Sequence, residues 1–455
     1  MRSWRVRWCS GCVPWPSMLD RNAALAETAR ASADRSGRST SARVPIVWQH
    51  QVVHVDFNEV IDRAGTAAVA AESYREFLLG DVPDDELPPA DADLLSMWVA
   101  DMDVAAPPVA IEAIRARLDR QILGYTRSSG EAYRAAFAGW CARRYGWSFD
   151  DEHLHIGRGV VPALTDLIDL ICSEGDKVVT LTPAYHWFEE APHQHGLELV
   201  TVRLAVDDER TTIDLAALEA ALADPAATLL LLCHPHNPNG RDWTVDELTA
   251  VADLCRAHGV RIISDEIHAD LLRSGRQHTP LAAVAPESDR IITCLAPSKT
   301  FNLAGLLFSN IIIPDEELGE AFAERNSGIT NPLSLAAATA VYQDGDEWLD
   351  ALRAHLDHNL RLVGETVASR LPHARFEMPE ATYLAWIDLG DHAAGIDDLS
   401  AFFAREAHVL VEGPHKFVAD AEQCIRVNVA CPTPKVVEAL DRMISALERR
   451  SAGAA

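Results

Sequence analysis

The chain has 455 residues, of which 48% are hydrophobic and 24% are charged, and its formal net charge is −28. This composition is typical of a soluble globular protein with enough apolar residues for a large core, and the length allows two or three domains. The negative charge would repel phosphate backbones and anionic lipids, and no window holds about 18 uninterrupted apolar residues, so we expect neither nucleic-acid nor membrane binding.

The first 48 residues differ in composition from the rest of the chain. They contain eight Arg, no Lys and three acidic residues. The lack of a continuous apolar stretch argues against a secretory signal, whereas an organellar transit peptide would have this Arg-rich composition. We expect residues 1–50 to be a disordered extension and residues 51–104 to be an N-terminal segment that packs with a smaller domain.

Between residues 105 and 330, short apolar runs alternate with helical patterns. Continuous apolar runs of this kind are typical of strands that are buried on both faces of a parallel sheet. The pattern predicts an α/β fold with a doubly wound, mostly parallel sheet in a large domain spanning 105–330. The predicted strands are 177–181 (KVVTL), 228–233 (TLLLLC), 260–264 (VRIIS), 290–295 (RIITCL) and 309–313 (SNIII).

Two helices between these strands have clear boundaries in the sequence. The helix that follows Thr244 has Glu247 three residues later, which is the pattern of a capping box, and Gly259 predicts its end. The stretch 162–175 has apolar residues on one stripe and is predicted to end at Gly175.

After residue 330 the pattern changes to that of a smaller α+β domain, 331–455. One long helix is predicted from about 333 to 368. Two strand-like stretches, 382–389 and 424–430, and a terminal helix follow it.

Polar residues follow the predicted strands at the edge where open α/β sheets bind ligands. The stretch 157–164 (GRGVVPAL) adds a glycine-flanked helix start, which can bind an anion through its free N–H groups. The strand-end residues are Tyr185, Asn237, Asp265, His268, Ser298 and Lys299.

Each of these residues alone is more often structural, but together they match the needs of one cofactor. Pyridoxal 5′-phosphate (PLP) needs a lysine for covalent attachment, a carboxylate at its pyridine nitrogen, and a hydrogen-bond donor at O3′. It also needs an aromatic plane to stack on and N–H groups for its phosphate. A lysine at the end of an apolar strand fits this use, because burial lowers its pKa toward useful basicity.

These motifs resemble the fold type I PLP enzymes of the class I/II aminotransferase-like group. Within that group the chain is most similar to the cystathionine β-lyase, or cysteine-S-conjugate β-lyase, branch (MalY/PatB-type). The resemblance covers about residues 55–450. It depends on FNEVIDRAGT, MWVADMDV, ILGYTR, GVVPAL, HPHNPNG, SDEIHADL and APSKTFNLAGL.

The resemblance implies roles for the residues around the ring of the cofactor. Lys299 would be the lysine that attaches PLP and then carries the proton. Asp265 would pair with the pyridinium nitrogen, and Asn237 would hydrogen-bond O3′, with His268 nearby. Tyr185 would stack on the ring.

The resemblance also implies how the phosphate and the substrate are held. The backbone N–H groups of Val160 and Val161, together with the Ser298 hydroxyl, would bind the phosphate. Tyr125 would reach across a homodimer interface to the phosphate of the partner. Arg426 would bind the α-carboxylate of the amino-acid substrate, and Asn237 would help to hold the substrate.

The activity that the resemblance implies is elimination at Cβ of a sulfur-containing L-amino acid such as L-cystathionine. An aminotransferase is the alternative, because it uses the same residues up to the loss of the α-proton. A ligand-sensing domain of a regulator is a third possibility, although residues 1–50 lack the pattern of a winged helix.

Cysteine usage predicts neither disulfides nor a metal site. The nine cysteines are scattered, and we expect them to be reduced thiols of a cytoplasmic protein. Cys9 and Cys12 form a C-x-x-C pair, but no second pair follows to complete a zinc site.

Overall fold

The computed structural model describes residues 55–454, except 81, 84–86, 90–91, 129, 208–209, 287 and 327. The predicted extension, residues 1–50, and the Cys9–Cys12 pair therefore lie outside the described residues. In the described part of the chain, no helix is both long and apolar enough to cross a membrane.

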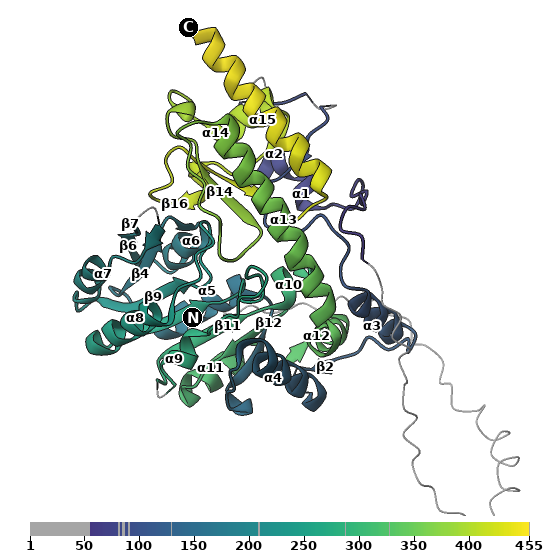
Figure 1. Cartoon of the computed structure of the whole chain (residues 1–455). Coiled ribbons are helices and arrows are strands. Elements are labelled where there is room, and N and C mark those ends of the chain that lie inside the picture. The colour runs from purple at the N-terminus through teal and green to yellow at the C-terminus, as the bar shows by residue number, and fades with distance from the viewer. Residues whose placement is uncertain are drawn as a thin grey trace, which may run out of the picture. The chain divides into compact units, whose positions relative to one another are not determined.

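A seven-stranded sheet forms the centre of the large domain within the described residues (Figure 1). The strand order is β3-β12-β11-β10-β9-β4-β6, and every pair is parallel except those made by β12. The five predicted strands are confirmed to within one residue at each end. The sheet consists of β3 (Leu154–Gly157), β4 (Lys177–Thr182), β6 (Glu198–Arg203), β9 (Ala227–Cys233), β10 (Arg261–Asp265), β11 (Ile291–Leu295) and β12 (Ser309–Ile312).

Helices cover both faces of this sheet, as the apolar runs predict. In β9, Leu229 and Leu231 pack in one core cluster, whereas Leu230 and Leu232 pack in the cluster on the opposite face. Each buried leucine contributes about 1.5–3 kcal/mol of transfer free energy. The first face carries α5 (Val160–Ile171), α6 (Trp187–Gln194) and α11 (Glu316–Asn326), and the second carries α7 (Leu215–Leu222) and α8 (Val245–His258).

The predicted capping box begins α8. Glu247 N–H donates to the Thr244 hydroxyl at 3.2 Å, and the Glu247 carboxylate accepts from Thr244 N–H at 2.8 Å. Gly259 ends the helix at φ 73°. The prediction for α5 is wrong at its end, because the chain becomes extended at Cys172 and Gly175 lies in the turn that follows.

The long helix predicted from 333 to 368 is instead two helices, α12 (Pro332–Asp344) and α13 (Asp346–Arg370). Gly345 separates them. A side chain there would place Cβ 2.7 Å from a ring carbon of Phe301 and 2.4 Å from the carbonyl oxygen of Val341. The close approach of Phe301 therefore requires the glycine, and the helical periodicity does not reveal this contact.

The smaller domain packs its helices on a two-stranded antiparallel sheet of β14 (Leu384–Asp388) and β17 (Cys424–Asn428). Figure 1 shows the long helix α13 beside the terminal helix α15 (Thr433–Ala454). The short strand β1 (Leu95–Ser96) pairs in parallel with β15 (Val409–Leu410) of this domain. This pairing agrees with the expected packing of the segment before residue 105, while the domain boundaries themselves stay predictions.

Candidate active site

Lys299 lies on α10 (Pro297–Thr300), a single turn that begins two residues after β11 ends. Its Nζ donates a hydrogen bond to the carbonyl oxygen of Ala100 at 2.6 Å. Burial and the charge of the Arg426 guanidinium together lower the pKa of the amine to about 8, although the charge of Asp101 opposes this shift. The amine is therefore closer to deprotonation than an ordinary lysine side chain.

Asp265 is the last residue of β10 and is only 6% exposed. One carboxylate oxygen accepts the N–H of Ile267 at 3.2 Å. Burial raises the pKa of the carboxyl to about 7, although the positive charge of Lys299 opposes this shift. A cationic N–H donor next to this carboxylate would stabilise its charged form.

Arg426 lies on β17 of the smaller domain and is 2% exposed. Its Nη1 donates to Oδ1 of Asn237 at 2.8 Å, and its Nη2 forms an ion pair with Glu412. The guanidinium also lies over the ring of Phe417, 5.2 Å from its centroid. A buried guanidinium thus faces the loop after β9, where it can donate hydrogen bonds to a carboxylate in addition to its present partners.

Tyr185 and His268 belong to the same group of residues. Tyr185 lies on β5 (Ala184–Tyr185), which pairs with β16 (Phe417–Val418), and burial together with Glu412 raises the pKa of its hydroxyl. His268 follows β10, and burial and the charges of Lys299 and Arg426 lower its pKa to about 3. His268 is therefore a neutral imidazole at neutral pH.

The start of α5 supplies backbone donors at the same edge of the sheet. Gly159 precedes the helix at φ 130°, and no side chain caps the first N–H groups, which belong to Val160 and Val161. Gly157 cannot carry a side chain, because its Cβ would lie 2.6 Å from the hydroxyl oxygen of Ser309. These uncapped N–H groups suit an anion such as phosphate.

Comparison of the sequence with known proteins identifies the family of this chain. Residues 92–444 match the family described as aminotransferase class I and II. The chain belongs to this family. It is 36% identical to cystathionine β-lyase PatB of Bacillus subtilis, over 78% of this chain and 93% of that protein. It is 33% identical to protein MalY of Escherichia coli, over 86% and 98% of the two chains.

A solved structure of a PLP enzyme has the same fold as this chain. The PLP-bound C–S lyase from Staphylococcus hominis, in complex with the inhibitor L-cycloserine, is 39% identical and superposes with a TM-score of 0.84. The match covers 87% of this chain and 99% of that chain. The expected fold class and the resemblance to PLP enzymes are thereby confirmed.

The site residues of this family member fit PLP. The Asp265 carboxylate is buried and has one backbone donor, the amine of Lys299 has a lowered pKa, and the start of α5 is uncapped. A pyridinium nitrogen, an aldehyde carbon and a phosphate are the groups that these three features would bind. Ser298 is half-buried and precedes Lys299 on α10, and its contact with the phosphate stays a prediction.

Tyr125 is the one predicted residue that the structure does not bring to this site. It is 96% exposed and lies in the loop before β2 (Thr126–Arg127). Ile122 and Leu123 in the same loop are 65% and 59% exposed. An exposed tyrosine flanked by exposed apolar residues suits a residue that works in the site of a partner subunit, and that role stays a prediction.

Sequence reasoning missed the groups that hold Lys299 and Arg426, which come from the N-terminal segment and from the smaller domain. The carbonyl oxygen of Ala100 accepts both Lys299 Nζ and the hydroxyl of Tyr383, the latter at 2.9 Å. Glu412 pairs with Arg426, and burial raises the pKa of its carboxyl. The only sequence signal for Glu412 is an acidic residue directly after the apolar run 409–411.

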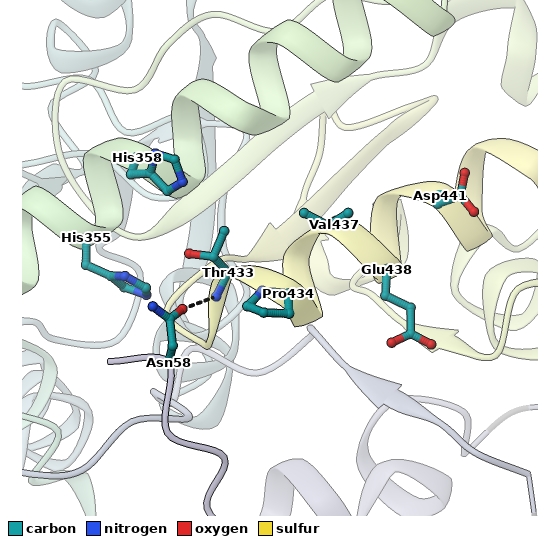
Figure 2. A pocket seen from close by; sticks show the side chains of 8 residues that line it. All are labelled: Asn58, His355, His358, Thr433, Pro434, Val437, Glu438 and Asp441. Atoms are coloured by element: carbon teal, nitrogen blue, oxygen red, sulfur yellow. Dashed lines mark hydrogen bonds between the residues drawn. The ribbon is translucent and has the colours of Figure 1, made fainter. Parts of the chain in front are cut away.

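A separate surface pocket of about 950 Å³ lies between α13 and α15. Figure 2 shows Asn58 in it, with Oδ1 accepting the backbone N–H of Thr433 at 2.9 Å. This pocket contains none of the strand-end residues, so its size does not make it the active site. Its lining consists of Asn58, His355, His358, Thr433, Pro434, Val437, Glu438 and Asp441.

Proposed function

We propose that this protein is a PLP-dependent C–S β-lyase that cleaves L-cystathionine or a related cysteine S-conjugate to pyruvate, ammonia and a thiol. The observation that carries the proposal is the grouping of Lys299, Asp265 and Arg426 in a chain whose relatives include a cystathionine β-lyase and a C–S lyase. The three residues supply a base, a buried carboxylate and a carboxylate-binding guanidinium.

Arg426 would bind and orient the substrate. Its guanidinium is held from two sides, by Asn237 and by Glu412, and can offer its remaining N–H groups to the substrate α-carboxylate. A fixed carboxylate fixes the direction of the Cα–H bond. Orientation of this kind lowers the entropic part of the barrier to proton removal.

Lys299 would carry the proton. Its lowered pKa makes its free amine a general base near neutral pH, and α10 holds it at the strand edge that also carries Asp265. After it removes the α-proton, the electron pair left at Cα forms the Cα–Cβ double bond as the Cβ–S bond breaks, and the sulfur leaves as a thiolate. Addition of water to the remaining three-carbon fragment releases pyruvate and ammonia.

Asp265 would tune the cofactor. When bound, PLP supplies an electron sink for the negative charge that develops at the substrate Cα. The Asp265 carboxylate would hold a proton on the pyridine nitrogen, Asn237 would donate to O3′, and Tyr185 would cover one face of the ring. Val160, Val161 and Ser298 would bind the phosphate.

We further propose a homodimer in which Tyr125 reaches the phosphate of the partner subunit. The exposure of Tyr125, Ile122 and Leu123 in one loop supports an interface there. We also propose a cytoplasmic location. The seven cysteines among the described residues are all free thiols, which is usual in a reducing compartment.

The test is to incubate the purified protein with L-cystathionine without any keto acid. A C–S β-lyase releases pyruvate and free thiol under these conditions. An aminotransferase would convert an L-amino acid only when a keto acid is added, and that outcome would refute the lyase proposal.

The role of Lys299 can be tested apart from the substrate. Lys299→Ala should abolish the visible absorbance of the lysine-bound cofactor and all activity. Lys177→Ala is the matched control, because Lys177 lies on β4 and pairs with Glu198 and Asp224 at the surface. Retention of the absorbance band in Lys299→Ala would show that another lysine attaches the cofactor.

A further inference from the structure

Three side chains from two loops converge behind the active-site edge of the sheet: His234, Asp242 and His278. His234 follows β9, Asp242 lies eight residues later, and His278 lies in the loop before α9 (Leu281–Val284). Oδ1 of Asp242 is 3.9 Å from Nδ1 of His234 and 3.8 Å from Nδ1 of His278. All three atoms lie within 4.8 Å of one another.

These three atoms are buried, and none has a hydrogen-bond partner among the described residues. The exposed fractions of His234, Asp242 and His278 are 0%, 8% and 1%. The separations of 3.8 and 3.9 Å are too long for hydrogen bonds between them. Buried polar atoms are nearly always satisfied, so a group bound between these three atoms would give each of them a partner.

The other ring nitrogens determine what the three atoms can bind. Nε2 of His234 faces the carbonyl oxygen of Thr279 at 3.0 Å, and Nε2 of His278 faces the carboxylate of Glu266 at 2.8 Å. Both partners accept hydrogen bonds, so each Nε2 carries a proton. Burial lowers the pKa of His234 to about 4, so its Nδ1 presents a lone pair toward the carboxylate of Asp242. Burial lowers the pKa of His278 as well, but Asp242 and Glu266 outweigh burial and raise that pKa to about 9, so an ion bound here would replace the proton on Nδ1 of His278.

We propose that His234, Asp242 and His278 form a binding site for a divalent transition-metal ion of the zinc type. Two imidazole nitrogens and one carboxylate oxygen are a ligand set that Zn²⁺ accepts, with a position left for a solvent molecule. Bond lengths of about 2.0–2.1 Å in a tetrahedral site put ligand atoms on the order of 3.3 Å apart. The two separations from Asp242 Oδ1 need to contract by about half an ångström.

The surroundings have the hydrogen bonds and the charge that such a site needs. The contact from His278 to Glu266 is the carboxylate–histidine–metal arrangement that orients histidine ligands, and the Thr279 carbonyl does the same for His234. A dication would also lie beside the buried carboxylate of Asp242, whose other cationic neighbour, Arg276, is 3.8 Å away.

A metal ion here would connect the loop after β9 to the rest of the active site. His234 and Asp242 stand at the two ends of the segment 234–242, which carries Asn237, the partner of Arg426. Glu266, the partner of His278, is the neighbour of Asp265. Binding would therefore fix the loop that presents Asn237, and would stabilise the folded protein because the three ligands meet only in the folded state.

The experiment uses the full-length holoenzyme, stripped with a chelator and then dialysed against Zn²⁺ alone. The expected result is one tightly bound Zn²⁺ per chain at unchanged PLP content, with a higher midpoint of thermal unfolding. Asp242→Asn and His278→Gln should each weaken Zn²⁺ binding by at least about 100-fold, which is the upper range for loss of an outer-shell partner. His236→Gln, a buried histidine of the same loop outside the three ligands, should bind Zn²⁺ like the wild type.

Metal-substituted forms of the wild type identify the ligands by spectroscopy even if the buried variants fail to fold. Cu²⁺ in place of Zn²⁺ should show hyperfine coupling to two nitrogens in electron paramagnetic resonance. Thiolate charge-transfer bands in the Co²⁺ form would show instead that cysteines, such as the Cys9–Cys12 pair, hold the ion, and would overturn the proposal. Zn²⁺ binding that is unchanged in Asp242→Asn would also overturn the proposal. So would the absence of stoichiometric Zn²⁺ binding by the wild type, which would mean that a proton satisfies these groups instead.

Discussion

The lowered pKa of Lys299 leads to a prediction about how fast the cofactor-free protein captures PLP. Only the neutral amine attacks the aldehyde, so the rate should follow the deprotonated fraction of Lys299. With a pKa of about 8, half of the amines are neutral at pH 8, against about 0.3% for an ordinary lysine at 10.5. The structure thus predicts an advantage of about 150-fold at this pH.

The assay is stopped-flow mixing of the cofactor-free protein with PLP between pH 6 and pH 10. The rate should rise about tenfold per pH unit below pH 7, because the amine is mostly protonated there, and should level off above about pH 8. A rate that keeps rising tenfold per unit through pH 9 would mean that Lys299 has an ordinary pKa, and would refute the reasoning.

Two aspartates of one segment supply a test variant and its control. Asp101 raises the pKa of Lys299, so Asp101→Asn should move the midpoint of the rate profile to lower pH. Asp103 lies two residues away and pairs with Lys435 at 2.7 Å. Because Asp103 is not among the groups that act on Lys299, Asp103→Asn should leave the midpoint unchanged.

Three further substitutions test the surroundings of the site. Asp270 accepts hydrogen bonds from three buried donors, including the Thr300 hydroxyl at 2.8 Å, so Asp270→Asn should lower the free energy of unfolding by about 2–4 kcal/mol; an unchanged urea midpoint would contradict this. Arg426→Lys should reduce kcat/KM for L-cystathionine by about 10- to 100-fold, because lysine lacks the planar fork, and equal kinetics would exclude Arg426 as the carboxylate site. Tyr125→Phe should weaken PLP binding in equilibrium dialysis by about 10-fold, through one lost phosphate hydrogen bond, whereas unchanged affinity would remove Tyr125 from the site.

The sheet could be predicted where its strands are buried on both faces. The run 228–233 is apolar throughout because Leu229 to Leu232 alternate between two covered faces. The edge strands β3 and β6 escaped prediction because they are shorter or partly exposed, so their sequences do not form continuous apolar runs. The break between α12 and α13 at Gly345 was not predicted, because the contact with Phe301 that requires a glycine comes from a distant part of the chain.

The cofactor residues could be predicted because parallel strands bring their carboxyl ends to one edge of the sheet. Asp265 and Lys299 follow neighbouring strands, β10 and β11, so their proximity follows from the topology. The partners of Lys299 and Arg426, Ala100 and Glu412, could not be predicted in this way. The contact of Lys299 with Ala100 uses a backbone carbonyl, which any residue type could supply. Glu412 faces Arg426 through an antiparallel β-bridge within the smaller domain, a pairing that the apolar pattern of the sequence does not specify.

The proposed metal site shows the same limit more clearly. His234, Asp242 and His278 are separated by 8 and 36 residues, which matches no short metal-binding motif, and the C-x-x-C pair that does match one lies outside the described residues. Sequence spacing detects ligands that share one helix or one turn, whereas these ligands meet because two loops leave the same edge of one sheet. The same edge brings Asp265 and Lys299 together. The topology that makes the PLP residues predictable from the strand ends therefore also brings these three ligands together, although their spacing in the sequence gives no sign of it.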